Sequence, residues 1–138
     1  MNGMFCNVLL YFMEEACMFF RLEHNCIYVT DMEKTLKFYE EALDLKVVRQ
    51  KKSDTMEIAF IGNGESSQQV EVIHTAGRTK PYDHGENSVH FALRTDDIEA
   101  ARARHTEMGC FDHDVPEFGV YYIKDPDGYL VEIMPVRK

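Results

Sequence analysis

An internal repeat between the two halves of the chain limits its fold more than any other feature. When the first half of the 138 residues is shifted by 66 positions, His24 falls on His90 and Asp31 falls on Asp97. In both halves the histidine lies in an alternating stretch rich in β-forming residues, and the aspartate lies where a helical pattern begins. The repeat therefore predicts two modules of the same fold.

The first half has the pattern of one strand, one helix and three further strands. Residues 22–29 alternate between apolar and polar positions, which indicates a strand. Thr30 and Glu33 have the spacing of a capping box, so we expect Thr30 to cap a helix whose apolar residues recur over about three turns. Further strands are predicted over residues 45–50, 55–61 and 69–74.

The second half repeats this order after a polar connection that contains Gly77, Pro81 and Gly85. Asp97 opens its helix. Strands are predicted over residues 88–94, 110–114, 119–124 and 129–135. We expect an α+β fold in which two paired βαβββ modules form a curved mixed-sheet cleft. Module one spans residues 21–75, the linker residues 76–87, and module two residues 88–136, together one domain.

Composition favours a small-molecule partner in a reducing compartment. The formal net charge is −9 and the 15 basic residues form no long run, which argues against nucleic acid or an anionic membrane as a partner. The cysteines have no framework or Cys-x-x-Cys spacing, so we expect free thiols and a cytoplasmic location. These cysteines are Cys6, Cys17, Cys26 and Cys110.

Residues 1–20 precede the first predicted strand and form an apolar extension of unknown role. They lack a basic start and a small-residue cleavage site, and they carry Glu14 and Glu15, so neither a signal peptide nor a membrane span is expected. Two interpretations stay open: an added helix, or an upstream extension whose natural start lies near Met18.

The last strand carries a carboxylate that needs a partner. The sequence Asp-Pro-Asp-Gly at residues 125–128 predicts a turn, so the strand starts near Tyr129 and Glu132 lies in its middle among apolar neighbours. A carboxylate held there must be paired, protonated or bound to a metal. Glu71 occupies nearly the same place in the first half, ten residues after Ile61, whereas Glu132 follows Ile123 by nine.

Each half thus offers one histidine and one glutamate. If the modules pair about a pseudo-twofold axis, His24, Glu71, His90 and Glu132 converge in one cleft and form a set of two nitrogen and two oxygen donors. Such a set suits a divalent ion, with nickel or zinc foremost and cobalt, iron or manganese as alternatives, and leaves positions open for catalysis. Taken singly, each residue is better explained as an ordinary strand residue.

The motifs resemble glyoxalase I, the lactoylglutathione lyase family of the vicinal oxygen chelate superfamily. The resemblance implies a homodimer with its site at the interface. It also implies a reaction in which the hemithioacetal of methylglyoxal and a thiol becomes a 2-hydroxyacyl thioester, with Glu132 as base and Glu71 as second candidate. It rests on residues 24–39, 59–62, 70–72, 89–93 and 125–132.

Departures from that family concern the thiol. Tyr28 and Glu86 stand where glutathione-using members place groups that dock its carboxylates, and Arg78 and Lys80 in the linker are candidate replacements.

Rival functions are an epimerase or dioxygenase of the same superfamily and a metal-free binding or resistance protein. The other four histidines are predicted to be surface or helix-face residues; these are His74, His84, His105 and His113.

Overall fold

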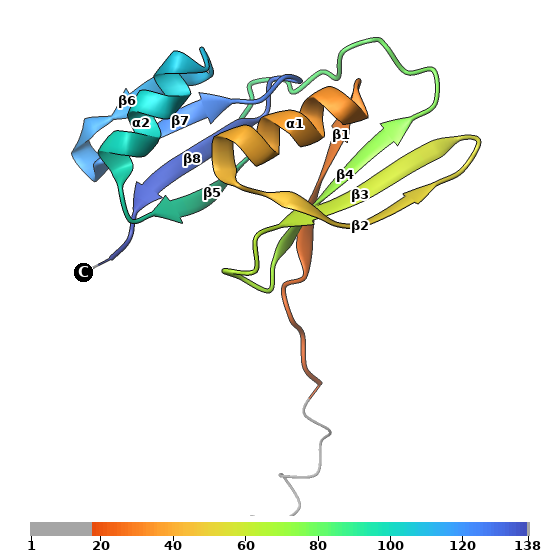
Figure 1. The fold of residues 1–138 in the computed structure, drawn as a ribbon, viewed down its shortest axis with the longest axis horizontal. Helices are drawn as coiled ribbons and strands as arrows, with labels where there is room; N and C mark the ends of the chain where they lie inside the picture. The colour runs from red at the N-terminus through yellow and green to blue at the C-terminus, as the bar shows by residue number, and fades with distance from the viewer. Residues whose placement is uncertain (1–17, 138) are drawn as a thin grey trace, which may run out of the picture.

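A computed structural model describes residues 18–137, which form two βαβββ modules lying side by side (Figure 1). The predicted fold class is confirmed, and every strand lies within two residues of its expected bounds. Most of the extension predicted over residues 1–20 lies outside the described residues, as do Cys6 and Cys17. Module one contains β1 (His24–Val29), α1 (Met32–Leu43), β2 (Lys46–Lys52), β3 (Met56–Gly62) and β4 (Gln69–Thr75). Module two contains β5 (His90–Thr95), α2 (Ile98–Glu107), β6 (Phe111–Val115), the 3-10 helix η1 (Pro116–Phe118), β7 (Val120–Lys124) and β8 (Leu130–Pro135).

Each module forms one four-stranded mixed sheet. The strand order is β1-β4-β3-β2 in module one and β5-β8-β7-β6 in module two. In both sheets the first strand of the module pairs in parallel with its last strand, and the remaining pairs are antiparallel. This pairing places each predicted histidine strand directly beside the corresponding glutamate strand.

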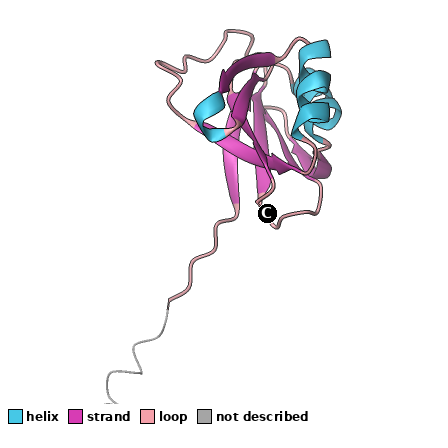
Figure 2. Ribbon diagram, turned by 90° about the vertical axis from the view of Figure 1, so that its left-hand side faces the viewer, coloured by secondary structure: helices cyan, strands magenta, loops and turns pink. Residues whose placement is uncertain are grey.

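The core lies between the sheets and the two helices, which cover the same side of the molecule (Figure 2). Alternation along β8 follows the prediction, because Val131 and Ile133 are buried at 0% and 2% exposure while Glu132 between them points to the other face. The helices therefore pack against the apolar face of each sheet and leave the opposite face uncovered. We call this the site face.

The helix caps correct one expectation. Asp31, not Thr30, is the N-cap of α1, and its carboxylate accepts a hydrogen bond from the Lys34 backbone N–H at 2.9 Å. Asp97 does the same for α2. The Thr30 hydroxyl instead donates to an Asp127 carboxylate oxygen at 2.7 Å. The capping-box pattern predicted that Thr30 caps the helix, but its side chain forms a hydrogen bond between the modules.

Two buried polar side chains cross between the modules. The Tyr39 hydroxyl of α1 donates to the Asp125 carboxylate at 2.8 Å, and the His105 Nε2 atom of α2 lies 2.8 Å from the Ala42 backbone oxygen. His105 also lies 2.9 Å from the Tyr121 hydroxyl. It is a helix-face residue, as predicted, but not a surface one, since only 1% is exposed and this burial lowers its pKa.

The predicted turn before β8 is confirmed and is held by contacts from the linker. Gly128 has a φ of 93°, which glycine adopts readily. His84 in the linker has its Nε2 atom 2.8 Å from the Asp127 backbone oxygen, and the Asn87 amide donates to the Gly128 oxygen at 3.0 Å. The linker is therefore tied to module two at the corner where β8 begins.

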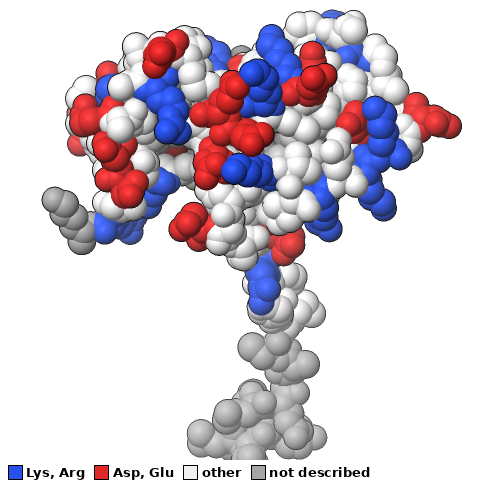
Figure 3. Space-filling view, viewed as in Figure 1, with Lys and Arg blue, Asp and Glu red and all other residues white. Residues whose placement is uncertain are grey.

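The helix-bearing side carries acidic and basic side chains interspersed (Figure 3). This mixture agrees with the absence of a long basic run from the sequence. Within residues 18–137, none of the helices is long and apolar enough to cross a membrane.

Candidate functional site

His24 and Glu71 meet on the site face of module one. The parallel register places Cys26 opposite Glu71, so His24, two residues earlier, projects from the same face. The His24 Nε2 atom lies 3.3 Å from a Glu71 carboxylate oxygen. Their side chains are 33% and 18% exposed, so the pair remains open to solvent.

His90 and Glu132 form the same pair in module two. Here Ala92 lies opposite Glu132, and His90 precedes it by two residues on β5. The His90 Nε2 atom lies 3.3 Å from a Glu132 carboxylate oxygen, and the side chains are 37% and 19% exposed. The internal repeat therefore holds at the level of donor atoms as well as of strands.

The spacing within each pair suits two ligands of one metal ion. A divalent ion with ligands at roughly 2.1 Å keeps adjacent donor atoms roughly 3.0–3.4 Å apart in octahedral or tetrahedral geometry. The observed separation of 3.3 Å falls within that range in both modules. Imidazole and carboxylate are also the donors that such ions prefer.

The two pairs do not meet within one chain. No group of three or more histidine, cysteine or acidic side chains among residues 18–137 is placed to hold an ion. The structure thus brings His24 to Glu71 and His90 to Glu132, but it leaves the pairs separate. Each pair alone supplies half, or less, of the ligands of a four- to six-coordinate ion.

One aromatic ring stands beside each pair, a feature that sequence reasoning missed. Phe60 on β3 lies opposite Glu71 and meets the edge of His24, with ring centroids 5.4 Å apart. Tyr122 on β7 lies opposite Glu132 and meets His90 at 5.0 Å. The repeat held a signal for these rings, since both lie in the strand that pairs with the glutamate strand.

A second pair of side chains lies over these rings because β2 and β6 both contain a register shift. The shifts fall between Val47 and Arg49 and between Phe111 and His113. The Arg49 guanidinium lies 3.7 Å from the centroid of Phe60, and the His113 ring stacks on Tyr122 at 4.7 Å and 7°. His113 is exposed, as predicted, yet it contacts the site.

Cys26 distinguishes the module one pair from the module two pair. Burial, a hydrogen bond to Glu71 and the charge of Glu71 raise the pKa of the Cys26 thiol to about 11. Cys26 lines a pocket wall. The cavity has a volume of about 330 Å³ and is also lined by His84, His90 and Tyr129. Its wall therefore includes residues of both modules and of the linker.

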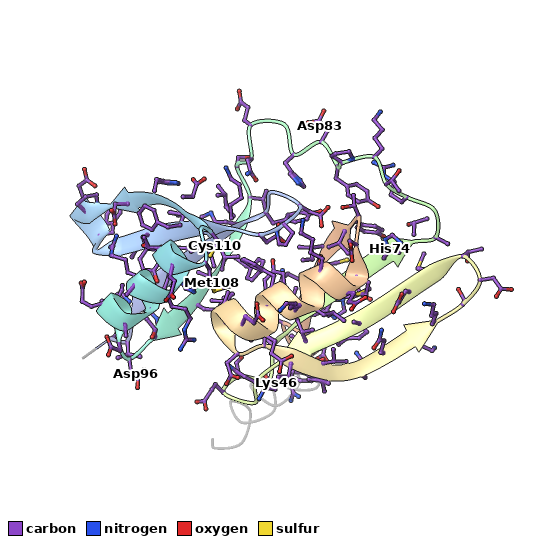
Figure 4. All side chains as sticks on the ribbon, turned by 45° about the horizontal axis from the view of Figure 1, so that its top comes forward. Lys46, His74, Asp83, Asp96, Met108 and Cys110 are labelled. Carbon is purple, nitrogen blue, oxygen red and sulfur yellow. The ribbon has the colours of Figure 1, made fainter. Side chains whose placement is uncertain are left out.

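Arg78, one of the two linker cations expected as replacements for carboxylate docking, has contacts within its own loop. The Arg78 guanidinium donates to the Lys80 and Pro81 backbone oxygens at 2.7 and 3.2 Å and lies over the Tyr82 ring. It is therefore engaged by its own loop. Asp83 in the same linker lines the cavity (Figure 4).

Comparisons with known proteins find matches that span both modules. The sequence profile described as Glyoxalase/Bleomycin resistance protein/Dioxygenase superfamily matches residues 21–133. A probable lactoylglutathione lyase of Vibrio parahaemolyticus is 32% identical over 130 residues, which cover 83% of this chain and 89% of the relative. The lactoylglutathione lyase of Haemophilus influenzae is 31% identical over 127 residues, with coverage of 80% and 89%.

A solved structure is similar over the same region. It is the glyoxalase I of Leishmania major, described as trypanothione-dependent, and it superimposes with a TM-score of 0.75 at 29% identity. The match covers 83% of this chain and 86% of that one. The similarity therefore extends over both modules rather than over one half.

Proposed function

Because the chain belongs to the Glyoxalase/Bleomycin resistance protein/Dioxygenase superfamily, we propose that it is a metal-dependent glyoxalase I-like lyase. It would convert the hemithioacetal of a 2-oxoaldehyde and a thiol into a 2-hydroxyacyl thioester and so detoxify methylglyoxal. The observation that carries this proposal is the pair of matching His–Glu contacts, each with donor atoms 3.3 Å apart.

His24, Glu71, His90 and Glu132 are the proposed ligands, with nickel or zinc as the foremost ion. The ion would polarise the two adjacent oxygens of the substrate and stabilise negative charge on them. The protein provides the rest of the site. The sheets hold the four side chains on rigid strands, and this keeps their donor atoms in place during reaction.

Glu132 is the proposed base. Its carboxylate takes the proton from the carbon that bears the hydroxyl and the sulfur, and it returns a proton to the neighbouring carbonyl carbon. The hydroxyl proton moves to the former carbonyl oxygen, so the reaction is an isomerisation in which no atom or electron is gained. Glu71 is the second candidate; the Cys26 thiol lies opposite it across β1 and β4, whereas Ala92 lies opposite Glu132.

A homodimer would complete the site. Each pair leaves ligand positions open, and both pairs lie on the exposed site face. Two chains related by a twofold axis would set module one of one chain against module two of the other and form two equal sites. This arrangement supplies all four ligands without any change within the chain.

The thiol is proposed to carry a carboxylate, as glutathione does. Arg49 supports this choice because its guanidinium lies on the site face over Phe60, which itself contacts His24. A guanidinium there can bind a carboxylate through paired hydrogen bonds. We place the enzyme in the cytoplasm, where the thiol pool is reduced.

Reconstitution with metal tests the proposal. Purified protein is stripped with a chelator, reloaded with nickel or zinc, and assayed with methylglyoxal and either glutathione or another small thiol. We expect about one ion per chain, loss of activity on stripping and recovery on loading. A protein that binds no transition metal and does not convert the adduct would contradict the proposal and favour a binding protein.

A further inference from the structure

Of the two rings that lie beside the His–Glu pairs, only that of Tyr122 carries a hydroxyl. Its counterpart Phe60 has none. We propose that Tyr122 is a further catalytic residue whose hydroxyl donates a hydrogen bond to the substrate oxygen on which negative charge develops. The inference rests on the proposed lyase function and assigns to module two a role that module one cannot share.

The hydroxyl is placed at the ligating atom of the pair. Its oxygen lies 3.4 Å from the His90 Nε2 atom, and the Tyr122 backbone is paired with Glu132 across β7 and β8. A substrate oxygen held by an ion bound to His90 would therefore lie near this hydroxyl. It would also lie near the carboxylate proposed as base.

The ring is held on both sides, so the hydroxyl does not have to be ordered during the reaction. The His90 ring meets its edge at 88°, and the His113 ring stacks on its face. His113 is in turn held by the Asp112 carboxylate at 2.6 Å, which also accepts from the Lys124 ammonium at 2.8 Å. Such preorganisation is what makes a hydrogen-bond donor effective toward developing charge.

The hydroxyl is also kept in the form that can donate. A tyrosine hydroxyl ordinarily has a pKa of about 10. The phenol therefore keeps its proton at neutral pH. Among the described residues, the contact found for this hydroxyl is the long one of 3.4 Å to His90 Nε2, so a substrate oxygen would gain a donor without displacing a strong hydrogen bond.

The test removes this hydroxyl and no other part of the ring. Phenylalanine fits the position, because module one carries Phe60 there. In metal-loaded Tyr122→Phe we expect kcat with methylglyoxal and glutathione to fall roughly 100-fold with little change in KM, at the lower end of what loss of one preorganised donor costs. Metal content, measured by elemental analysis, should equal that of the wild type.

A neighbouring tyrosine supplies the matched control. Tyr121 lies on the other face of β7, and its hydroxyl contacts His105 in the core. Tyr121→Phe should lower thermal stability and leave kcat unchanged, whereas Tyr122→Phe should do the reverse. The two variants therefore separate a catalytic hydroxyl from a structural one.

Binding of an unreactive analogue gives a readout independent of turnover. The probe is a hydroxamate derivative of glutathione, whose two adjacent oxygens carry the charge of the reacting pair. Tyr122→Phe should bind it roughly 10-fold more weakly while binding the product thioester nearly as well. Unchanged kcat and analogue affinity in an active, metal-loaded protein would overturn the role of Tyr122 alone. Failure of the wild type to react would overturn both the lyase proposal and this inference.

Discussion

The two modules share one backbone plan but differ in the row of side chains that crosses the site face. Both rows contain the glutamate and an aromatic ring, and the differences lie around them. The row in module one is Cys26, Glu71, Phe60 and Arg49; in module two it is Ala92, Glu132, Tyr122 and His113. Module one thus has a cation and a thiol in the row that contains its glutamate. Module two has a phenol and no thiol in the corresponding row. The comparison teaches that the repeat places the proposed ligands alike in both modules, whereas the side chains beside them differ in chemistry.

The largest expected effect separates the two glutamates. We predict that Glu132→Gln lowers kcat roughly 10³-fold, because it removes the proposed base, and that Glu71→Gln lowers it less at equal metal content. Steady-state kinetics on metal-loaded proteins measures both. The reverse order would show that the division of roles between the modules is inverted.

Mixed dimers test whether the modules of two chains share a site. Alone, His24→Ala and His90→Ala should each lose at least ~100-fold in activity, because every site lacks one ligand. When the two variants are refolded together, mixed dimers have one site with all four ligands, so random pairing should restore roughly a quarter of wild-type activity. Co-refolded wild type is the control. Absence of recovery, despite dimers seen by light scattering, would contradict a shared site.

The contacts that each helix makes with the other module give a stability comparison. Tyr39 and His105 occupy corresponding places in α1 and α2, and each crosses to the other module. Tyr39→Phe leaves the buried Asp125 carboxylate without one donor, so we expect a loss of about 1–3 kcal/mol in the free energy of unfolding, measured in urea. An unchanged midpoint would mean that this hydroxyl adds nothing to module pairing.

His105 adds a pH dependence to that comparison. Burial lowers its pKa in the folded chain below the ordinary value of 6.5, so the unfolded chain binds the proton first as pH falls. Its contribution is fully present above pH 6.5 and should be lost progressively below it. Urea midpoints at pH 7.5 and 5.5 should differ more in the wild type than in His105→Gln. An equal difference in both proteins would assign the pH dependence elsewhere.

The smallest expected effect concerns the cation of module one. Arg49→Gln should raise KM for the glutathione adduct about 3- to 10-fold and leave kcat nearly unchanged, since a solvent-exposed guanidinium contributes modestly to binding. Lys51→Gln on the same strand is the control for general charge. A fall in kcat without a change in KM would place Arg49 in the chemistry instead.

Much of the architecture could be predicted because it depends on local patterns. Alternation located the strands, the 66-residue repeat related the modules, and the turn before β8 set the face of Glu132. The side of the sheet that Val131 and Ile133 bury follows from that register. Period-two alternation allows only two faces, so one correct turn places every side chain of the strand.

Other features escaped prediction because they depend on contacts between distant segments. The register shifts in β2 and β6 bring Arg49 and His113 over their rings, yet no residue type in either strand marks the shift. Thr30 was expected to cap a helix and instead binds Asp127, 97 residues away. Local pattern cannot weigh a cap against a tertiary hydrogen bond of similar strength.

The sequence by itself determined the duplicated modules, the strands that carry His24, Glu71, His90 and Glu132, and the faces from which they project. Only the tertiary structure decided that the donors meet as two separate pairs, which rings and charges surround them, and that His105 is buried. The physical reason is the separation along the chain over which each kind of interaction acts. Periodicity and turn chemistry act over a few residues, whereas the distance between the pairs is set by how whole modules pack.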